Sequence, residues 1–314
     1  SYLLEGSYVG NRGTRLGVDR QINNTPAQYL STSPVRDQRT FDFLSFQTPN
    51  PFRGTNPIYG TNISRGNLLR PYPHFGNIVV EEPIGYNWYH SLQMRIEKRF
   101  SQGYTFGLAY TWSKLMEAVE FLNSTDALPT EAISGQDRPQ RIAVSGIYEF
   151  PFGRGRQFGG SMPKALDLVA GGWQLNAIVI FQSGQALGFG NALFLGNIKD
   201  ISLDSGSRHV DRWFNTEAGF NKNTQQQLAS NLRSHPPRFN HVRSDSQNRW
   251  DLSAIKNVAV HERFKVQFRA ECFNALNHPN FANPNTAPTN TSFGRITGTN
   301  AQARTFQFAL KTEF

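Results

Sequence analysis

The 314-residue sequence contains a single cysteine, Cys272, and only three methionines. One cysteine excludes an internal disulfide framework and a metal site built from several cysteines. Because Cys272 lies in an alternating, extended pattern, we interpret it as a small strand side chain rather than a nucleophile. No apolar run approaches the roughly 18 residues of a transmembrane helix. The sequence therefore does not describe a helical membrane protein.

Long runs of like charge are also missing, although the formal net charge is +9. Arginines occur singly, in loop-like stretches and on the polar sides of predicted strands, as solvated side chains do. This scatter argues against nucleic acid as a partner. It fits better with attraction to the anionic lipid of an outer membrane.

Catalytic and metal-binding patterns are missing as well. The sequence has no nucleophile elbow, no HExxH and no paired carboxylates at a defined spacing. The GRGR stretch at 153–156 lacks the Lys-Ser/Thr pair and the following helix of a phosphate loop, and it reads as a turn. We therefore predict no enzyme activity and no cofactor, although a barrel enzyme could still assemble its residues from separate strands. The spacing of the loop aspartates and histidines matches no metal site: Asp200, Asp204, His209, His235 and His241.

What the sequence does contain is strict two-residue alternation, clearest in residues 88–114. Apolar residues occupy one parity of the first arm: Leu92, Met94, Ile96 and Phe100. Polar residues occupy the other parity: Gln93, Arg95, Glu97 and Arg99. After the turn Ser101–Gly103, a second arm alternates Tyr104, Phe106, Leu108, Tyr110 and Trp112 with small or polar residues. The pattern predicts a hairpin with one apolar, aromatic face and one polar face.

Similar alternation recurs along the chain and predicts eight strands, near 2–9, 88–100, 103–114, 140–150, 172–182, 248–260, 263–273 and 304–314. The connections alternate between long and short or intermediate, with a turn expected at 261–263. Transmembrane barrels combine short periplasmic turns with long extracellular loops, and each crossing needs about 9–11 residues. The predicted fold class is therefore an all-β, antiparallel transmembrane β-barrel segment of about eight strands in the bacterial outer membrane. Both chain ends would lie on the periplasmic side.

Two alternatives remain open. Eight strands can close into a small barrel of their own, which would serve adhesion or surface binding through its long loops. A soluble sandwich or a secreted β-rich binding module would also alternate, but it would bury its aromatic rows in a common interior. The positions that decide between lipid and protein interior are Phe106, Trp173 and Phe308.

The polar parity of two hairpin regions supplies the candidate lumen-facing residues. These are Gln93, Arg95, Glu97, Arg99, Lys265, Gln267, Arg269 and Glu271. Such charges on facing arms are expected to neutralise one another, or to meet a plug, more often than to bind a ligand. The ligand itself cannot be identified, because the loops mix arginine, asparagine and aromatic residues.

The long connections are predicted to be irregular. The stretch from Asn11 to about Pro83 is rich in Asn, Pro, Gly and Arg, which predicts a turn or bulge at Asn11–Gly13 followed by disorder or a large surface loop. Within 183–247, the segment Asp211–Asn215 is expected to pack as a small folded element.

Several stretches, in order, resemble the C-terminal part of TonB-dependent outer-membrane receptors of the Oar-like group, which carry a carboxypeptidase-regulatory-like domain near the N-terminus. These stretches are YVGNRGTRL at 8–16, the hairpin 88–114, YEFPFGRGRQF at 148–158, GGWQLNAIVIFQSG at 171–184, FRAECFNALNHPNF at 268–281, FGRI at 293–296 and RTFQFALKTEF at 304–314. Together they cover most of the chain.

The resemblance implies a 22-stranded barrel closed by an N-terminal plug, with ligand import energised through TonB. Residues 1–314 would be the C-terminal part of that barrel domain, without the plug, the TonB box and the N-terminal domain. Because the sequence begins without Met and without a signal peptide, we expect it to be a fragment of a longer protein. Phe314 resembles the C-terminal aromatic residue that signals to the barrel assembly machinery. The implied partners are that machinery, outer-membrane lipid, the TonB system and an unknown ligand.

Overall fold

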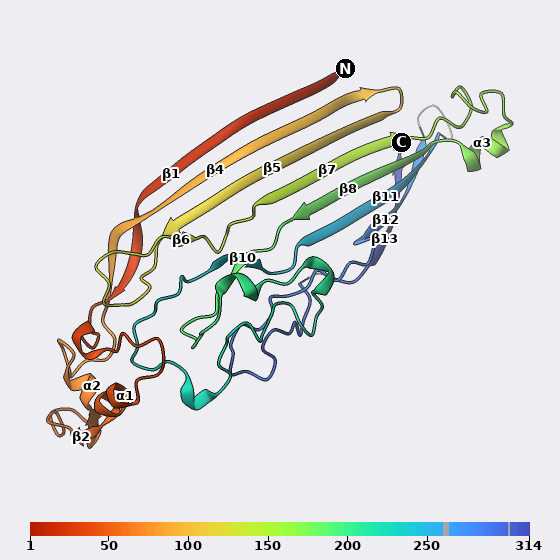
Figure 1. The fold of residues 1–314 in the computed structure, drawn as a ribbon. Helices are drawn as coiled ribbons and strands as arrows, with labels where there is room; N and C mark the ends of the chain where they lie inside the picture. Colours follow the sequence, from red (N-terminus) through yellow and green to blue (C-terminus); the bar gives the residue numbers. More distant parts are fainter. Residues whose placement is uncertain (260–263, 301) are drawn as a thin grey trace.

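The computed structural model describes residues 1–259, 264–300 and 302–314, and one antiparallel sheet dominates it (Figure 1). Its long strands follow chain order, and each pairs with the next. They are β1 (Tyr2–Gln21), β4 (Val79–Ser101), β5 (Tyr104–Ala118), β7 (Gln140–Glu149), β8 (Trp173–Gln182), β11 (Gln247–Ala259), β12 (Lys265–Phe273) and β13 (Thr305–Glu313). The short β6 (Ala132–Ile133) pairs with β5 beside this series. The all-β prediction is confirmed, and each of the eight predicted segments is a strand of this sheet.

The first two long strands extend further than predicted. β1 continues to Gln21, and β4 begins at Val79 rather than at Trp88. The turn or bulge expected at 11–13 is displaced: these residues stay in register with β4, and the irregularities fall between Thr14 and Val18. Hydrophobic alternation marks only the part of a strand with one apolar face, so a polar extension of a hairpin leaves little trace in the sequence.

The register places the predicted apolar residues of neighbouring strands on one face. One cross-strand row joins Leu4, Ile96, Leu108, Val144, Val179 and Trp250. A second row joins Leu252, Cys272 and Phe306. The next row over from the first, on the opposite face, is Glu5, Arg95, Ala109, Ala143, Ile180 and Arg249. We call these two sides the apolar face and the polar face.

The apolar face is not packed in a protein interior. Phe308 is 66% exposed, and Phe106 and Trp173 are half-buried. None of the three belongs to the cluster of buried hydrophobic residues. The rows of the sheet thus have the exposure that a lipid-facing surface needs.

Connections at the two ends of the sheet differ as predicted at the tight β4–β5 turn, but the connection 150–172 is no shorter than the connection 119–139 at the opposite end. The chain ends lie near the hairpin turn between β4 and β5 and near the connection between β7 and β8, which carries α3 (Lys164–Ala170) (Figure 1). The four long connections leave from the opposite end. The turn predicted at 261–263 lies outside the described residues. No helix that the structure describes is long and apolar enough to span a membrane.

The long connection 22–78, predicted to be disorder or a surface loop, is an ordered surface segment with short elements of its own. These are η1 (Ala27–Tyr29), α1 (Gln38–Ser45), β2 (Gln47–Pro49), β3 (Asn62–Ser64) and α2 (Arg65–Leu68). Asp37 begins α1, where its side chain accepts a hydrogen bond from the Thr40 amide at 3.1 Å. This is the usual way to satisfy a free amide at a helix start.

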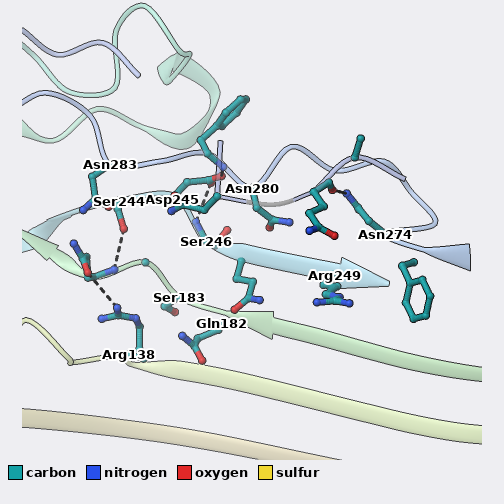
Figure 2. A pocket seen from close by; sticks show the side chains of 18 of the residues that line it. Arg138, Gln182, Ser183, Ser244, Asp245, Ser246, Arg249, Asn274, Asn280 and Asn283 are labelled. Atoms are coloured by element: carbon teal, nitrogen blue, oxygen red, sulfur yellow. Dashed lines mark hydrogen bonds between the residues drawn. The ribbon is translucent and has the colours of Figure 1, made fainter. Parts of the chain in front are cut away.

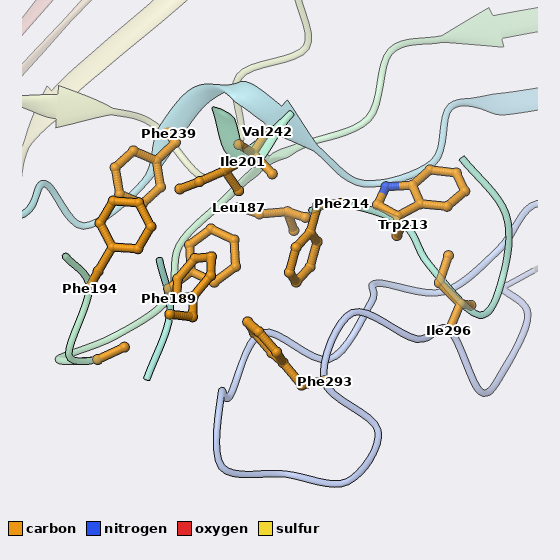
Figure 3. Packing of buried hydrophobic residues seen from close by; sticks show 12 residues of the cluster. Leu187, Phe189, Phe194, Ile201, Trp213, Phe214, Phe239, Val242, Phe293 and Ile296 are labelled. Carbon is orange, nitrogen blue, oxygen red and sulfur yellow. The ribbon is translucent and has the colours of Figure 1, made fainter. Parts of the chain in front are cut away.

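The main hydrophobic core lies in the loops rather than under the sheet. Segments 183–246 and 274–304, which we call the loop cap, contain β9 (Ala186–Leu187), β10 (Phe239–Arg243), η2 (Ile198–Ile201), η3 (Ser205–Ser207) and η4 (Thr224–Gln226). Figure 3 shows the buried aromatic and aliphatic side chains that hold the cap together. Trp213 and Phe214 belong to this cluster, so the segment predicted to fold at Asp211–Asn215 does pack, but as part of this larger core rather than as an element of its own.

The sheet is open. Within the described residues, no hydrogen-bonded pairing joins β1 to β13, so these two strands form its edges. The structure does not show the self-closed barrel that eight strands could have formed.

Candidate functional site

A polar cavity of about 400 Å³ lies where the polar face of the sheet meets the loop cap. Figure 2 shows side chains of β8 and β11 on one side of it and those of the cap segment 274–304 on the other. Amide, hydroxyl and guanidinium groups dominate its lining, including Arg138, Gln182, Ser183, Gln185, Ser244, Asp245, Gln247, Arg249, Asn274, Asn280, Asn283, Asn300, Gln302 and Thr305.

The floor of the cavity continues the polar face. Gln182 of β8 lies directly opposite Gln247 of β11, and Phe273 of β12 lies opposite Thr305 of β13. Arg249 follows Gln247 on the same face. The two-residue period that separates the faces therefore also delivers polar side chains to this end of the sheet.

Two arginines, Arg138 and Arg249, line the cavity. Arg138 Nη1 donates to the carbonyl oxygens of Gly135 and Asp137, each at 3.0 Å, and its Nη2 donates to Gln185 Oε1 at 3.2 Å. Burial, assisted by the neighbouring Arg243, lowers the pKa of Arg138, while Asp137 opposes the shift. Arginine nevertheless stays protonated in proteins.

The carboxylates near the cavity are already engaged. Asp245 Oδ2 accepts the amide of Phe281 at 2.9 Å, and its Oδ1 accepts the amide of Ser246 at 2.8 Å. Asp251 accepts Arg249 Nε at 2.8 Å and the amide of Asn274 at 2.9 Å. Arg249 is thus paired with Asp251, Asp245 is held by backbone amides, and the cavity presents chiefly amide groups. It is suited to a hydrophilic ligand that has several hydrogen-bonding groups.

The predicted lumen-facing residues lie on the polar face, but in two groups. Gln93, Arg95 and Glu97 lie on β4, whereas Gln267, Arg269 and Glu271 lie on β12, with β5, β7, β8 and β11 between them. Arg99 lies near the end of β4, and Lys265 is the first residue of β12, so both lie at the end of the sheet opposite the long connections. None of the eight lines the cavity.

Their charges contact one another instead. Arg95 pairs with Glu97, and Arg269 Nη1 lies 3.7 Å from Glu271 Oε1. Residues two apart on a strand share a face, so these pairs form within each strand. This agrees with the expectation that such charges would mostly neutralise one another.

The residues that line the cavity were not predicted from the sequence. For Gln182, Gln247 and Arg249 a signal existed, because each lies on the polar parity near the loop end of a predicted strand. For Arg138, Asp245 and Asn280 the sequence held no such signal. These residues lie in loops, where no regular spacing predicts which side chains come together.

The loop histidines do not come together. His241 Nε2 lies 2.8 Å from the carbonyl oxygen of Ile198, whereas the ring of His235 packs edge-on against Phe194. Among the described residues, no group of three or more His, Cys, Asp or Glu side chains is arranged to hold a metal ion.

Comparisons with known proteins agree with this architecture. No curated protein and no solved structure matches the chain significantly. A family model described as an outer membrane beta barrel domain matches residues 1–307. That match, which covers nearly the whole chain, places the protein in the outer membrane. The chain belongs to the outer membrane β-barrel domain family.

Proposed function

We propose that this chain is part of the wall of an Oar-like, TonB-dependent outer-membrane receptor, which captures a hydrophilic ligand beneath its loops and imports it in the full-length protein. The observation that carries the proposal is the amide-lined, arginine-bearing cavity between the polar face and the loop cap. Its place at the loop end is where a ligand from outside would first meet the polar side of the wall. The proposed role is binding and transport, without catalysis, cofactor, metal or nucleic acid.

The open edges of the sheet support a larger barrel. β1 is 20 residues long and β13 is 9 residues long, and the backbone groups that point away from the sheet along their outer sides have no strand to pair with. Hydrocarbon offers these groups no hydrogen bonds, so membrane strands close into barrels without edges. We infer that further strands complete the wall, so that residues 1–314 form one part of a larger barrel.

Apolar side chains on the polar face support a plug. Ile178 is 53% exposed and Ile147 is 36% exposed, although both point to the side of the sheet that carries the ion pairs. A water-filled channel would leave these two side chains exposed to solvent, whereas a folded domain inside the barrel would cover them.

The end of the chain suits recognition during assembly. Phe314 is 94% exposed, and its ring stacks on Phe264 with centroids 5.5 Å apart. We propose that this exposed aromatic residue contacts the barrel assembly machinery.

Energised uptake can be tested without knowing the ligand. Cells producing the full-length protein, cells lacking it and cells producing Arg249→Gln are grown in a complex medium, and solutes lost from the medium are identified by mass spectrometry. We expect a hydrophilic solute to be depleted only by cells with the protein, and more slowly with Arg249→Gln. A matched variant, Lys311→Gln, alters a polar-face cation far from the cavity and should match the parent.

An uncoupler that collapses the proton gradient distinguishes import from surface binding. Energised import predicts that depletion stops. Depletion that continues unchanged, with the solute retained on the cell surface, would contradict TonB-dependent transport.

Surface binding is the second candidate, and segment 22–78 supplies the observation that favours it. Phe43, Phe46 and Ile58 are 43%, 54% and 78% exposed, and the guanidinium of Arg65 lies 4.5 Å and 4.8 Å from the centroids of the two phenylalanine rings. An exposed aromatic surface at the outer end of the molecule is suited to adhesion. Deleting 38–68 should abolish cell attachment under this hypothesis and leave solute depletion intact.

A further inference from the structure

A second cavity, a groove of about 550 Å³, is lined by side chains of the apolar face, by Ser91 and Ser113, and by Pro139, Asn240 and Arg243 from the loops. It is at the loop end of the apolar face, where Tyr8, Leu92 and Trp112 lie side by side in one row of β1, β4 and β5. Tyr8 is 68% exposed and Trp112 is 59% exposed. In a membrane, this part of the face meets lipid rather than ligand in the lumen.

The rows that follow change from apolar to basic. The row beyond Trp112 is Gly10, His90 and Lys114, and the next contains Arg12, Trp88 and Met116. A strand crosses a bilayer in about 9–11 residues. Because Tyr104 begins β5 at the opposite end, Trp112 lies at the ninth residue and Lys114 at the eleventh. The cations therefore lie at the outer boundary of the membrane.

The lysines at the other end of the same face are arranged differently. Lys98 is 2% exposed, and its Nζ donates to the carbonyl oxygens of Ser101 at 2.7 Å and Tyr104 at 3.0 Å. Lys256, 8% exposed, donates to the carbonyl oxygen of Gly171. The protein itself thus supplies oxygen partners for the inner lysines.

The outer cations have no such partners. Among the described residues, neither Lys114 Nζ nor the guanidinium of Arg12 has a hydrogen-bond or ion-pair partner, and Glu131, close to Arg12, accepts the hydroxyl of Tyr86 at 2.7 Å. Arg243, which also lines the groove, is paired with Asp137. The outer end therefore presents free positive charge directly above an aromatic, apolar surface.

From this asymmetry we infer that the groove binds a phosphorylated glycolipid of the outer leaflet, with acyl chains along Leu92 and Trp112 and phosphate at Lys114. Arg12 lies one row beyond the groove and adds positive charge beside that phosphate. Aromatic residues suit the boundary between acyl chains and head groups, and basic pockets at that depth bind anionic head groups. The inference rests on membership of the outer-membrane barrel family and on the face of the wall. It does not depend on the proposed transport.

The test uses the full-length protein, purified from outer membranes in detergent and stripped of lipid. Binding of diphosphorylated lipid A, of its dephosphorylated form and of inorganic phosphate is measured for four proteins. These are the parent, Lys114→Gln, Lys114→Arg and the control Lys311→Gln, each confirmed as folded by heat-modifiable gel migration. If Lys114→Gln does not fold, Arg12→Gln takes its place with the same expectations.

We expect the parent to prefer the phosphorylated lipid, and Lys114→Gln to bind it roughly fivefold more weakly, the loss of one cation near a lipid head group. Binding of the dephosphorylated lipid should not change. Lys114→Arg and Lys311→Gln should behave like the parent. Equal affinity of the parent for both lipids, unchanged binding by Lys114→Gln, or displacement of the lipid by millimolar inorganic phosphate would each overturn the inference.

Discussion

The ion pair between Asp137 and Arg243 joins the loop cap to the connection before β7, and removing it tests how the cavity is held. Arg243 Nη2 lies 2.7 Å from Asp137 Oδ2, and their side chains are 16% and 0% exposed. Asp137 Oδ1 accepts the amide of Leu115 at 2.7 Å, and Arg243 Nη1 donates to the carbonyl oxygen of Gly184 at 3.0 Å. Asp137→Ala would leave a buried guanidinium without its counter-charge and an amide without its acceptor.

The expected cost can be estimated from comparable pairs. Breaking a buried ion pair by removing one partner destabilises proteins by about 3–5 kcal/mol. Because about 1.4 kcal/mol changes an equilibrium constant tenfold, the cap should open more often by two to nearly four orders of magnitude. The exposed pair of Arg295 and Asp211, with side chains 53% and 61% exposed, provides the matched control. Asp211→Ala should cost less than about 1 kcal/mol.

Hydrogen exchange measured by mass spectrometry on the full-length protein in detergent separates the cap from the sheet. Peptides from 183–246 should lose protection in Asp137→Ala, while peptides from β7, β8 and the part of β5 before Leu115 keep it. Asp211→Ala should exchange like the parent. Equal protection of the cap in the two variants would show that the buried pair does not fasten it, and that the hydrophobic cluster alone is sufficient.

Three further predictions concern other parts of the molecule. Phe214→Ala empties a position that is 1% exposed in the cap core, and should destabilise the cap by about 3–5 kcal/mol, seen as faster proteolysis within 183–246. Phe308→Arg on the apolar face should reduce the heat-modifiable, folded protein in outer membranes, because arginine facing mid-bilayer lipid costs about 2–4 kcal/mol, whereas Ala309→Arg on the polar face should not. Hydrogen bonds from the Thr40 amide and, second, from the Thr40 hydroxyl lower the pKa of Asp37 from its ordinary value of 3.8. The ionised carboxylate therefore stabilises the start of α1 at pH values above 3.8, and this stabilisation is lost as the pH falls through the lowered pKa. Exchange protection of α1, corrected for intrinsic rates, should fall accordingly in the parent but show no such step in Asp37→Asn.

Strands and faces could be predicted because membrane strands obey one simple constraint. A side chain that faces lipid must be apolar and its neighbour need not be, so Phe106, Leu108 and Tyr110 mark their own face without any knowledge of their partners. The same constraint fails beyond the membrane. Residues 14–21 and 79–87 pair with each other across two register shifts, and their alternation is too weak to predict a strand.

The cap and the cavity could not be predicted for a different reason. Phe189, Phe214 and Phe293 come from segments separated by dozens of residues, and their rings meet only after both cap segments fold. Periodicity reports on regular elements, whereas this core is built from turns. Only the Trp213–Phe214 pair was dense enough in sequence to indicate local packing.

The two kinds of cation on the apolar face also define the membrane boundaries, which alternation alone left open. Lys98 is bound to the backbone oxygen of Tyr104, where β5 begins, and Lys114 follows ten residues later on that strand. Ten steps of an antiparallel strand extend about 34 Å. With the tilt of about 35–45° that barrel strands have, the vertical separation becomes roughly 24–28 Å, close to the apolar band of about 25 Å in such barrels. A lysine that faced lipid midway between these two would have neither backbone oxygens nor head groups within reach, so the described strands place their apolar-face lysines only at or beyond the two boundaries.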